Sequence, residues 1–162
     1  MNPDGSDQRP IPDPHIYTEL AAWEAFSPDR TQQIVVRTEG NAELWLITHD
    51  GSQDEWRITY TAQYDYDPAW SPTGDLIAFV AEHTGNGDIY IATPLGFAAE
   101  RITFNEDPYD RHPTWSPDGQ SVAFWSNAQF GLRQIYIYDI FTHETRIVGG
   151  GPFNDWDPLW VK

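Results

Sequence analysis

The chain has 162 residues, of which 40% are hydrophobic and 15% aromatic, so it can bury a core and is not a disordered acidic chain. Nine Lys and Arg stand against 25 Asp and Glu, and this net charge of −16 argues against binding to nucleic acid or to anionic membranes. The absence of Cys excludes disulfides and Cys-ligated zinc. The apolar runs are the length of strands, which excludes membrane insertion.

Short apolar runs rich in Ile, Val, Tyr, Trp and Phe recur in groups of four along the chain, and we predict each run to be a β-strand. The first group comprises residues 20–27, 33–38, 43–48 and 55–60. The second group comprises residues 68–71, 75–82, 88–93 and 100–103. The third group comprises residues 113–116, 120–126, 134–140 and 144–148.

The groups follow one repeat with a period of about 45 residues. The motif Asp-x-x-Pro-x-Trp occurs at 65–70, 110–115 and 155–160, and a weaker copy has Phe26 in place of the Trp. Pro at the second position and Gly at the last predict tight turns at 71–74 and 116–119. Four short strands per repeat of this length predict a blade of a β-propeller. We expect the repeated Trp residues to pack between neighbouring blades.

The repeat unit, Asp-x-x-Pro-x-Trp-Ser-Pro-x-Gly followed by Ala-Phe, Asp-Ile-Tyr and Arg-Ile-Thr, resembles the TolB-like β-propeller repeat, one of the WD40-like propeller repeats. The match is best at 65–103 and 110–148 and partial at 23–59. The resemblance implies an all-β fold of four-stranded antiparallel blades, with about three blades in this chain and six in a complete ring.

On this basis the whole chain, 1–162, is one TolB-like propeller region. We divide it into an outer strand of a preceding blade with a linker (1–16), blade 1 (17–61), blade 2 (62–106), blade 3 (107–151) and the inner strand of a closing blade (152–162). Three blades alone would leave hydrophobic sheet faces exposed. We therefore expect either a half-propeller that associates with a second copy or, preferably, part of a longer propeller.

The loops that enter the inner strands carry the candidate binding residues, because loops on a rigid scaffold carry function. The repeated Asp residues of these loops either form a ring of carboxylates for a cation or a basic peptide, or cap backbone N–H groups. Their neighbours differ between the copies, which favours recognition, and the aromatic ones could anchor a partner. The candidates are Asp65, Tyr66, Asp67, Tyr109, Asp110, Arg111, His112, Asp155, Trp156 and Asp157.

No residue pattern for catalysis is visible in the sequence. The serines Ser27, Ser71 and Ser116 recur once per repeat as turn residues, and no Gly-x-Ser-x-Gly motif is present. The five His are dispersed without metal-ligand spacing, so we predict no metal site and no cofactor. The sequence therefore predicts a non-enzymatic scaffold that binds a protein or peptide through the loops of its top face.

Three alternatives stay open at this point: the propeller domain of a prolyl-oligopeptidase-like serine hydrolase, a metal-dependent sugar-active propeller enzyme, and a fragment without an independent role. The resemblance to TolB implies protein partners and a periplasmic or extracytoplasmic location. Residues 1–14 show no basic and apolar regions of a signal peptide, so a cytoplasmic location also stays open.

Overall fold

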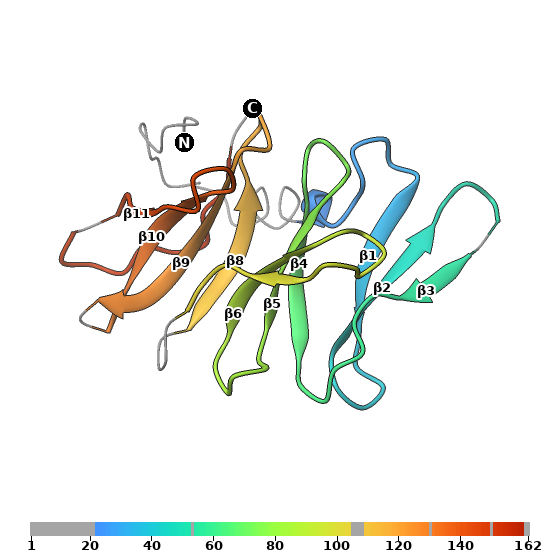
Figure 1. Cartoon of the computed structure of the whole chain (residues 1–162), viewed down its shortest axis with the longest axis horizontal. Helices are drawn as coiled ribbons and strands as arrows, with labels where there is room; N and C mark the ends of the chain where they lie inside the picture. The colour runs from blue at the N-terminus through green and yellow to red at the C-terminus, as the bar shows by residue number, and fades with distance from the viewer. Residues whose placement is uncertain (1–21, 53, 105–108, 130, 150, 161–162) are drawn as a thin grey trace.

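Three antiparallel β-sheets stand side by side in the computed structural model, which describes residues 22–52, 54–104, 109–129, 131–149 and 151–160 (Figure 1). The first sheet contains β1 (Gln32–Arg37), β2 (Glu43–Thr48) and β3 (Glu55–Arg57). The second contains β4 (Asp65–Trp70), β5 (Ile77–Ala81), β6 (Asp88–Ala92) and β7 (Glu100–Arg101). The third contains β8 (Asp110–Trp115), β9 (Ser121–Gln129), β10 (Leu132–Asp139) and β11 (Thr145–Ile147).

This arrangement confirms the predicted all-β fold of antiparallel propeller sheets. The second sheet lies within the predicted blade 2 and the third within blade 3, each with its strands in sequence order. β4 and β8 lie next to each other in the middle of the molecule, while β3 and β11 lie at opposite outer edges (Figure 1). The outer strand expected in residues 1–16 falls outside the described residues.

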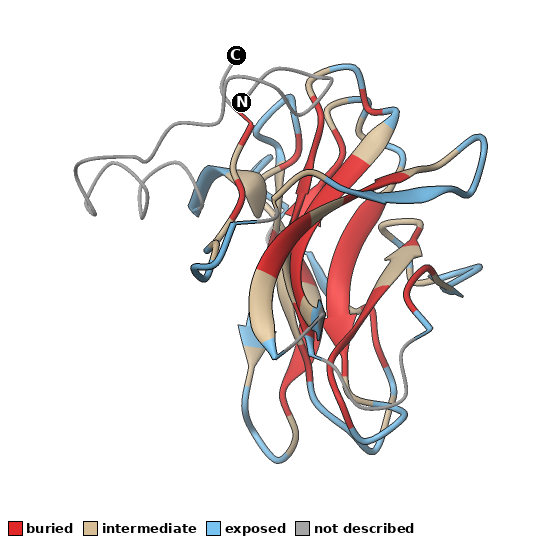
Figure 2. Cartoon of the chain, turned by 90° about the vertical axis from the view of Figure 1, so that its left-hand side faces the viewer, coloured by how far each residue is buried: buried red, intermediate tan, exposed pale blue. Residues whose placement is uncertain are grey.

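The core lies between the sheets because the central strands bury both of their faces. All five residues of β5 are buried, and successive side chains point to opposite sides. Ile77 and Phe79 pack in a cluster with residues of the first sheet. Ala78 and Val80 pack with residues of the third sheet, including Trp115. Buried residues accordingly run along the middle of the strands, and exposed residues gather in the loops at both ends (Figure 2).

The repeated turns and tryptophans take the predicted positions. The N–H of Gly74 donates to the carbonyl oxygen of Ser71, and Gly119 repeats this bond to Ser116. Gly74 adopts a φ of 84°, which a residue without a side chain reaches at no steric cost. The side chains of the three motif tryptophans are buried, as expected for packing between blades: Trp70, Trp115 and Trp160.

Two predicted inner strands were wrong. The described part of the strand expected at 20–27 has a turn of helix at 22–24, and Phe26 makes only an isolated bridge to Gln33. Its sequence, Leu-Ala-Ala-Trp-Glu-Ala-Phe, is rich in strong helix formers and lacks the Pro of the other copies. The first sheet therefore has three strands. The described residues of the closing strand, 152–160, form no strand either, although the N–H of Asp155 donates to the carbonyl oxygen of Arg133 in β10.

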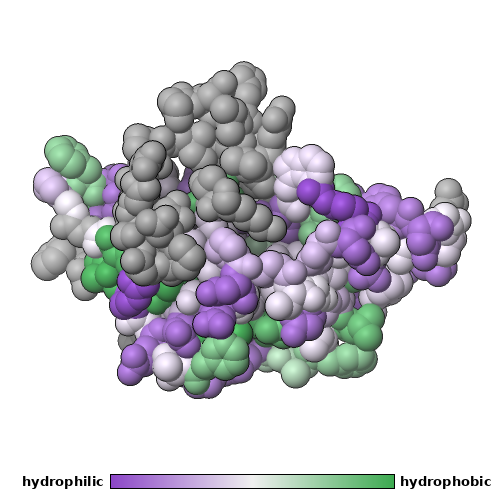
Figure 3. All heavy atoms as spheres, turned by 90° about the horizontal axis from the view of Figure 1, so that it is seen from above, coloured by the Kyte–Doolittle hydropathy of each residue, from purple (hydrophilic) through white to green (hydrophobic). Residues whose placement is uncertain are grey.

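The surface combines polar and apolar groups. Seen from above, hydrophobic side chains of the described residues form separate groups among hydrophilic ones (Figure 3). Within the described residues, no helix has the length and hydrophobicity needed to cross a membrane.

Candidate functional site

A kink in the inner strand recurs at one position of the repeat. The pairing of β4 with β5 shifts register between Tyr66 and Ala69, and that of β8 with β9 shifts between Arg111 and Thr114. The residues at these bulges have a positive φ, 51° at Asp67 and 54° at His112, and the equivalent Asp157 has 35°. Asp and His tolerate this left-handed region better than most residues. Bulges redirect side chains and are frequent next to functional sites.

The three kinked residues meet at one end of the molecule. His112 Nε2 lies 3.7 Å from Asp67 Oδ2, and His112 Nδ1 lies 3.5 Å from Asp157 Oδ1. Burial raises the pKa of the Asp67 carboxyl, while the nearby His112 and Arg111 oppose that shift. The bulges therefore bring together side chains of the second sheet, the third sheet and the C-terminal segment. We call this end of the sheets, where β4 and β8 begin, the mouth.

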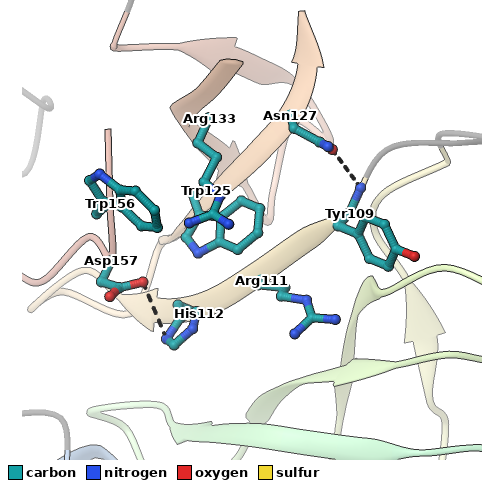
Figure 4. A pocket seen from close by; sticks show the side chains of 8 residues that line it. All are labelled: Tyr109, Arg111, His112, Trp125, Asn127, Arg133, Trp156 and Asp157. Atoms are coloured by element: carbon teal, nitrogen blue, oxygen red, sulfur yellow. Dashed lines mark hydrogen bonds and ion pairs between the residues drawn. The ribbon is translucent and has the colours of Figure 1, made fainter. Parts of the chain in front are cut away.

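A hollow of about 430 Å³ opens at the mouth beside His112. We call it the mouth pocket, and Figure 4 shows its wall, built from β8, β9, β10 and the C-terminal segment. Its lining residues are Tyr109, Arg111, His112, Trp125, Asn127, Arg133, Trp156 and Asp157.

Five of the residues predicted from the sequence line this pocket, and three lining residues were missed. Trp125, Asn127 and Arg133 lie on β9 and at the start of β10, outside the loops that the repeat emphasised. A signal was nevertheless present, because these positions depart from the repeat. The second copy has Val, Glu and Gly at the equivalent positions, namely Val80, Glu82 and Gly87.

Arg133 lies between two indole rings. Its guanidinium carbon is 3.9 Å from the ring centroid of Trp156 and 4.6 Å from that of Trp125. Such stacking is favourable because a cation is attracted to the electron-rich face of an aromatic ring. The backbone is held as well, since the Arg133 N–H donates to Asn154 Oδ1 at 2.8 Å and the Arg133 carbonyl accepts from the N–H of Asp155 at 2.8 Å. Arg133 is therefore fixed on both sides before any ligand arrives.

Arg111 occupies the opposite wall of the mouth pocket and is restrained in a similar way. Its guanidinium carbon lies 5.2 Å from the ring centroids of both Tyr66 and Tyr109, and its Nη2 lies 3.5 Å from Glu82 Oε1. The hydroxyl of Tyr66 donates to the same Glu82 oxygen at 2.8 Å, and burial raises the pKa of this phenol. Tyr66 is thus half-buried support for Arg111 rather than an exposed anchor.

The side chains of two of the repeated Asp residues are more buried than those of the neighbouring candidates. Asp65 and Asp110 are fully buried, so their carboxylates do not form an exposed ring at the mouth. Asp65 Oδ2 accepts a hydrogen bond from Thr61 Oγ1 at 2.9 Å, and Asp65 Oδ1 lies 3.2 Å from His83 Nε2. The backbone N–H of each repeated Asp donates at 2.8 Å to the preceding sheet or segment, at the carbonyl oxygens of Ala42, Gly87 and Arg133.

Exposure separates the remaining candidates. Trp156 is 59% exposed and Tyr109 41% exposed, although both line the mouth pocket. In the part of the chain that the structure describes, no three His, Asp or Glu side chains are grouped so as to hold a metal ion. The mouth therefore offers exposed aromatic surface and two restrained guanidinium groups in a chain that is otherwise strongly acidic.

The family model of the TolB β-propeller domain matches residues 18–161, which is most of the chain. The chain belongs to the TolB β-propeller domain family. A search among curated proteins found none that matches it. The family match agrees with the three sheets, the turns and the buried tryptophans described above.

Solved structures share the TolB-type fold. TolB from Acinetobacter baumannii is 23% identical, with a TM-score of 0.67, over 76% of this chain and 31% of that chain. A protein from Agrobacterium tumefaciens assigned as TolB is 24% identical, also with a TM-score of 0.67, over 82% of this chain and 52% of that one. A puromycin hydrolase is 16% identical, with a TM-score of 0.68, over 85% and 23%. This chain thus spans about a third to a half of the length of the two TolB-type structures.

Proposed function

We propose that this TolB-type propeller region is a non-catalytic recognition module that binds a peptide segment of a partner protein in the mouth pocket. The observation that carries the proposal is the exposed Trp156, held against Arg133 at the edge of a hollow of about 430 Å³. Trp, Tyr and Arg are the residues that contribute most binding energy at protein interfaces. All three types line this pocket.

The setting of the mouth pocket supports binding without large rearrangement. Its side chains are held by strands, backbone hydrogen bonds and ring stacking, so little conformational entropy remains to be lost on binding. Its volume lies within the range of about 300–1,000 Å³ typical of ligand pockets.

The residues of the pocket favour recognition over catalysis. Among the residues that the structure describes, no Ser, Thr or Lys lines it as a nucleophile, and its His112 lies between two carboxylates, those of Asp67 and Asp157. A location outside the cytoplasm and self-association that completes a ring belong to the same proposal. The likeness to TolB supports the location. The association is proposed because three sheets are fewer than the six blades expected of a complete ring.

A displayed library of random 12-residue peptides, selected on the immobilised chain, tests the proposal. We expect enriched peptides to bind the chain and to bind Trp156→Ala at least tenfold more weakly, because a truncated aromatic hot spot costs about 2 kcal/mol or more. Trp23→Ala is the matched control, since Trp23 is 54% exposed and also stacks on an arginine, at 3.3 Å from Arg30. Enrichment of no peptide, or equal binding to Trp156→Ala, would refute the proposal.

A further inference from the structure

Arg133 differs from four other arginines of this acidic protein in its lack of a carboxylate partner. Four arginines lie within 3.5 Å of a carboxylate oxygen: Arg37, Arg57, Arg101 and Arg111. Among the described residues, no carboxylate lies within ion-pairing distance of Arg133. Arg30 shares this feature and stacks on Trp23, but it lies outside the mouth pocket. Arg133 is thus a restrained guanidinium in the wall of the mouth pocket without a carboxylate partner among the described residues.

The stacking of Arg133 on two indoles leaves the edge of its guanidinium available for hydrogen bonds. The indoles of Trp125 and Trp156 cover the guanidinium, while the N–H donors of a guanidinium lie in its plane and point outward. These donors match the two oxygens of a carboxylate, which can accept two parallel hydrogen bonds. Aromatic neighbours also exclude water, and this strengthens an ionic hydrogen bond.

Other groups in the wall of the mouth pocket are also donors. Trp125 is 5% exposed, and its buried Nε1–H has no acceptor among the described residues. Asn127 Oδ1 accepts the N–H of Tyr109 at 2.7 Å, which leaves the amide NH₂ of Asn127 as a donor (Figure 4). Arg111 adds a second guanidinium from the opposite wall. Of the described lining residues, Asp157 alone carries a carboxylate, which lies beside His112. Donors therefore outnumber acceptors in this pocket.

We propose that the mouth pocket binds a carboxylate of an acidic peptide, with Arg133 as the residue that recognises it. This inference rests on the proposed function and adds the chemical class of the bound segment. A single carboxylate suits the pocket better than a nucleic acid, because a net charge of −16 repels a long polyanion. The carboxylate belongs either to an Asp or Glu side chain or to a chain terminus, which present the same group.

Titration of the full chain with small carboxylates, followed by NMR of the Arg Nε–H and Trp indole N–H signals, tests the inference. N-acetyl-glutamate methylamide supplies a side-chain carboxylate, N-acetyl-alanine supplies a terminal one, and N-acetyl-glutamine methylamide is the uncharged control. We expect saturable shifts of the Arg133, Trp125 and Trp156 signals with at least one carboxylate, and at least tenfold weaker binding of the glutamine compound.

Variants of Arg133 test whether this residue is the one that binds the carboxylate. Arg133→Gln should abolish the saturable shifts of both indoles, and Arg133→Lys, which keeps the charge but loses the planar donors, should weaken binding at least threefold. Arg37→Gln is the matched control, because Arg37 also stacks on an indole, at 4.7 Å from Trp45, and lies outside the pocket. The dispersion of the remaining signals shows whether each variant is folded. Equal shifts with glutamine, or unchanged binding by folded Arg133→Gln, would overturn the inference.

The two proposals fail in different ways. Displayed peptides that depend on Trp156 but bind equally well after their carboxylates are converted to amides would overturn the carboxylate inference and leave the proposed function intact. Saturable carboxylate shifts without any enriched peptide would overturn the proposed function and support the carboxylate site.

Discussion

The indole nitrogen of Trp115 donates a hydrogen bond to the carbonyl oxygen of Ala69, 46 positions earlier in the chain, at 3.1 Å. The next copy repeats this bond, since Trp160 Nε1 donates to the carbonyl oxygen of Thr114 at 3.2 Å. Trp115 and Trp160 therefore each link their inner segment to the preceding inner strand through a directional bond in addition to their buried rings. This bond explains why these two copies have an aromatic residue with a polar N–H at this position.

Replacement of Trp115 by Phe tests the value of this link. Trp115→Phe should lower the free energy of unfolding by about 2 kcal/mol, because the variant loses a buried hydrogen bond and leaves a small cavity. Trp70→Phe is the matched control. Trp70 Nε1 is buried without an acceptor among the described residues, so the loss should be about 1 kcal/mol smaller. Urea unfolding of both variants measures the difference, and equal losses would contradict the role of the bond.

The burial of the Glu24 carboxyl should make the stability of the fold depend on pH. Thr114 Oγ1 donates a hydrogen bond to Glu24 Oε1 across the inner end of the sheets, and burial raises the pKa of Glu24 from its ordinary value of 4.5 to about 7. A carboxyl with a raised pKa in the folded state binds its proton more tightly when folded. Its contribution to stability is therefore greatest below pH 4.5, falls as the pH rises from about 4.5 to 7, and stays constant above that.

Glu24→Gln should remove this dependence while keeping a polar group beside Thr114. We expect Glu24→Gln to match the original chain near pH 4 and to exceed its stability at pH 8, by on the order of 1–3 kcal/mol. Thermal unfolding at several pH values measures the difference between the two proteins. Glu39→Gln removes an exposed carboxylate and controls for the change in net charge. A pH-independent difference for Glu24→Gln would show that this carboxyl does not titrate as described.

Gly96 is required by a close contact between the first and second sheets. It has a φ of 78°, and a Cβ atom there would lie 2.2 Å from the carbonyl oxygen of Ile58. Gly96→Ala should therefore destabilise the fold by about 2–3 kcal/mol. Gly85→Ala is the control, because Gly85 has a φ of 96° with no atom within 4 Å of a Cβ, so only the backbone strain of about 1 kcal/mol applies. Thermal unfolding that ranks the two variants equally would be evidence against the contact.

The ion pair between Arg101 and Asp88 should be far more important than a surface pair. Asp88 is fully buried, and Arg101 Nη2 lies 2.9 Å from its Oδ1. Arg101→Met should lower stability by about 3 kcal/mol, because a buried carboxylate would lose its cation. Arg37→Met removes an exposed pair with Glu55 and should have a much smaller effect. Chemical unfolding of both variants gives the comparison, and similar losses would show that Asp88 is satisfied without Arg101.

The 45-residue repeat allowed the blades to be predicted from the sequence, because each repeat contains its own turns and strand pattern. Ser71 and Gly74 define a turn through local geometry, and the uninterrupted apolar run of β5 is typical of a strand buried on both faces. The strand predicted at 20–27 was wrong because the local sequence there favours another structure. Helix-forming residues around Glu24 outweighed the weak copy of the motif.

The mouth pocket shows the limit of that reasoning. Arg111, His112 and Trp156 were predicted because they vary beside a repeated turn, whereas Arg133 and Trp125 come from strands that looked structural. The repeated Asp65 was included among the candidate binding residues of the loops, although the fold buries it completely.

By itself the sequence determined the family, the strand order and the turns, because these depend on residue types a few positions apart and on one recurring period. Only the tertiary structure decided which side chains share a pocket and which aspartates are buried. Residues far apart in the chain, such as Arg133 and Trp156, come into contact only when the strand bulges and the packing of neighbouring sheets fix where each side chain points.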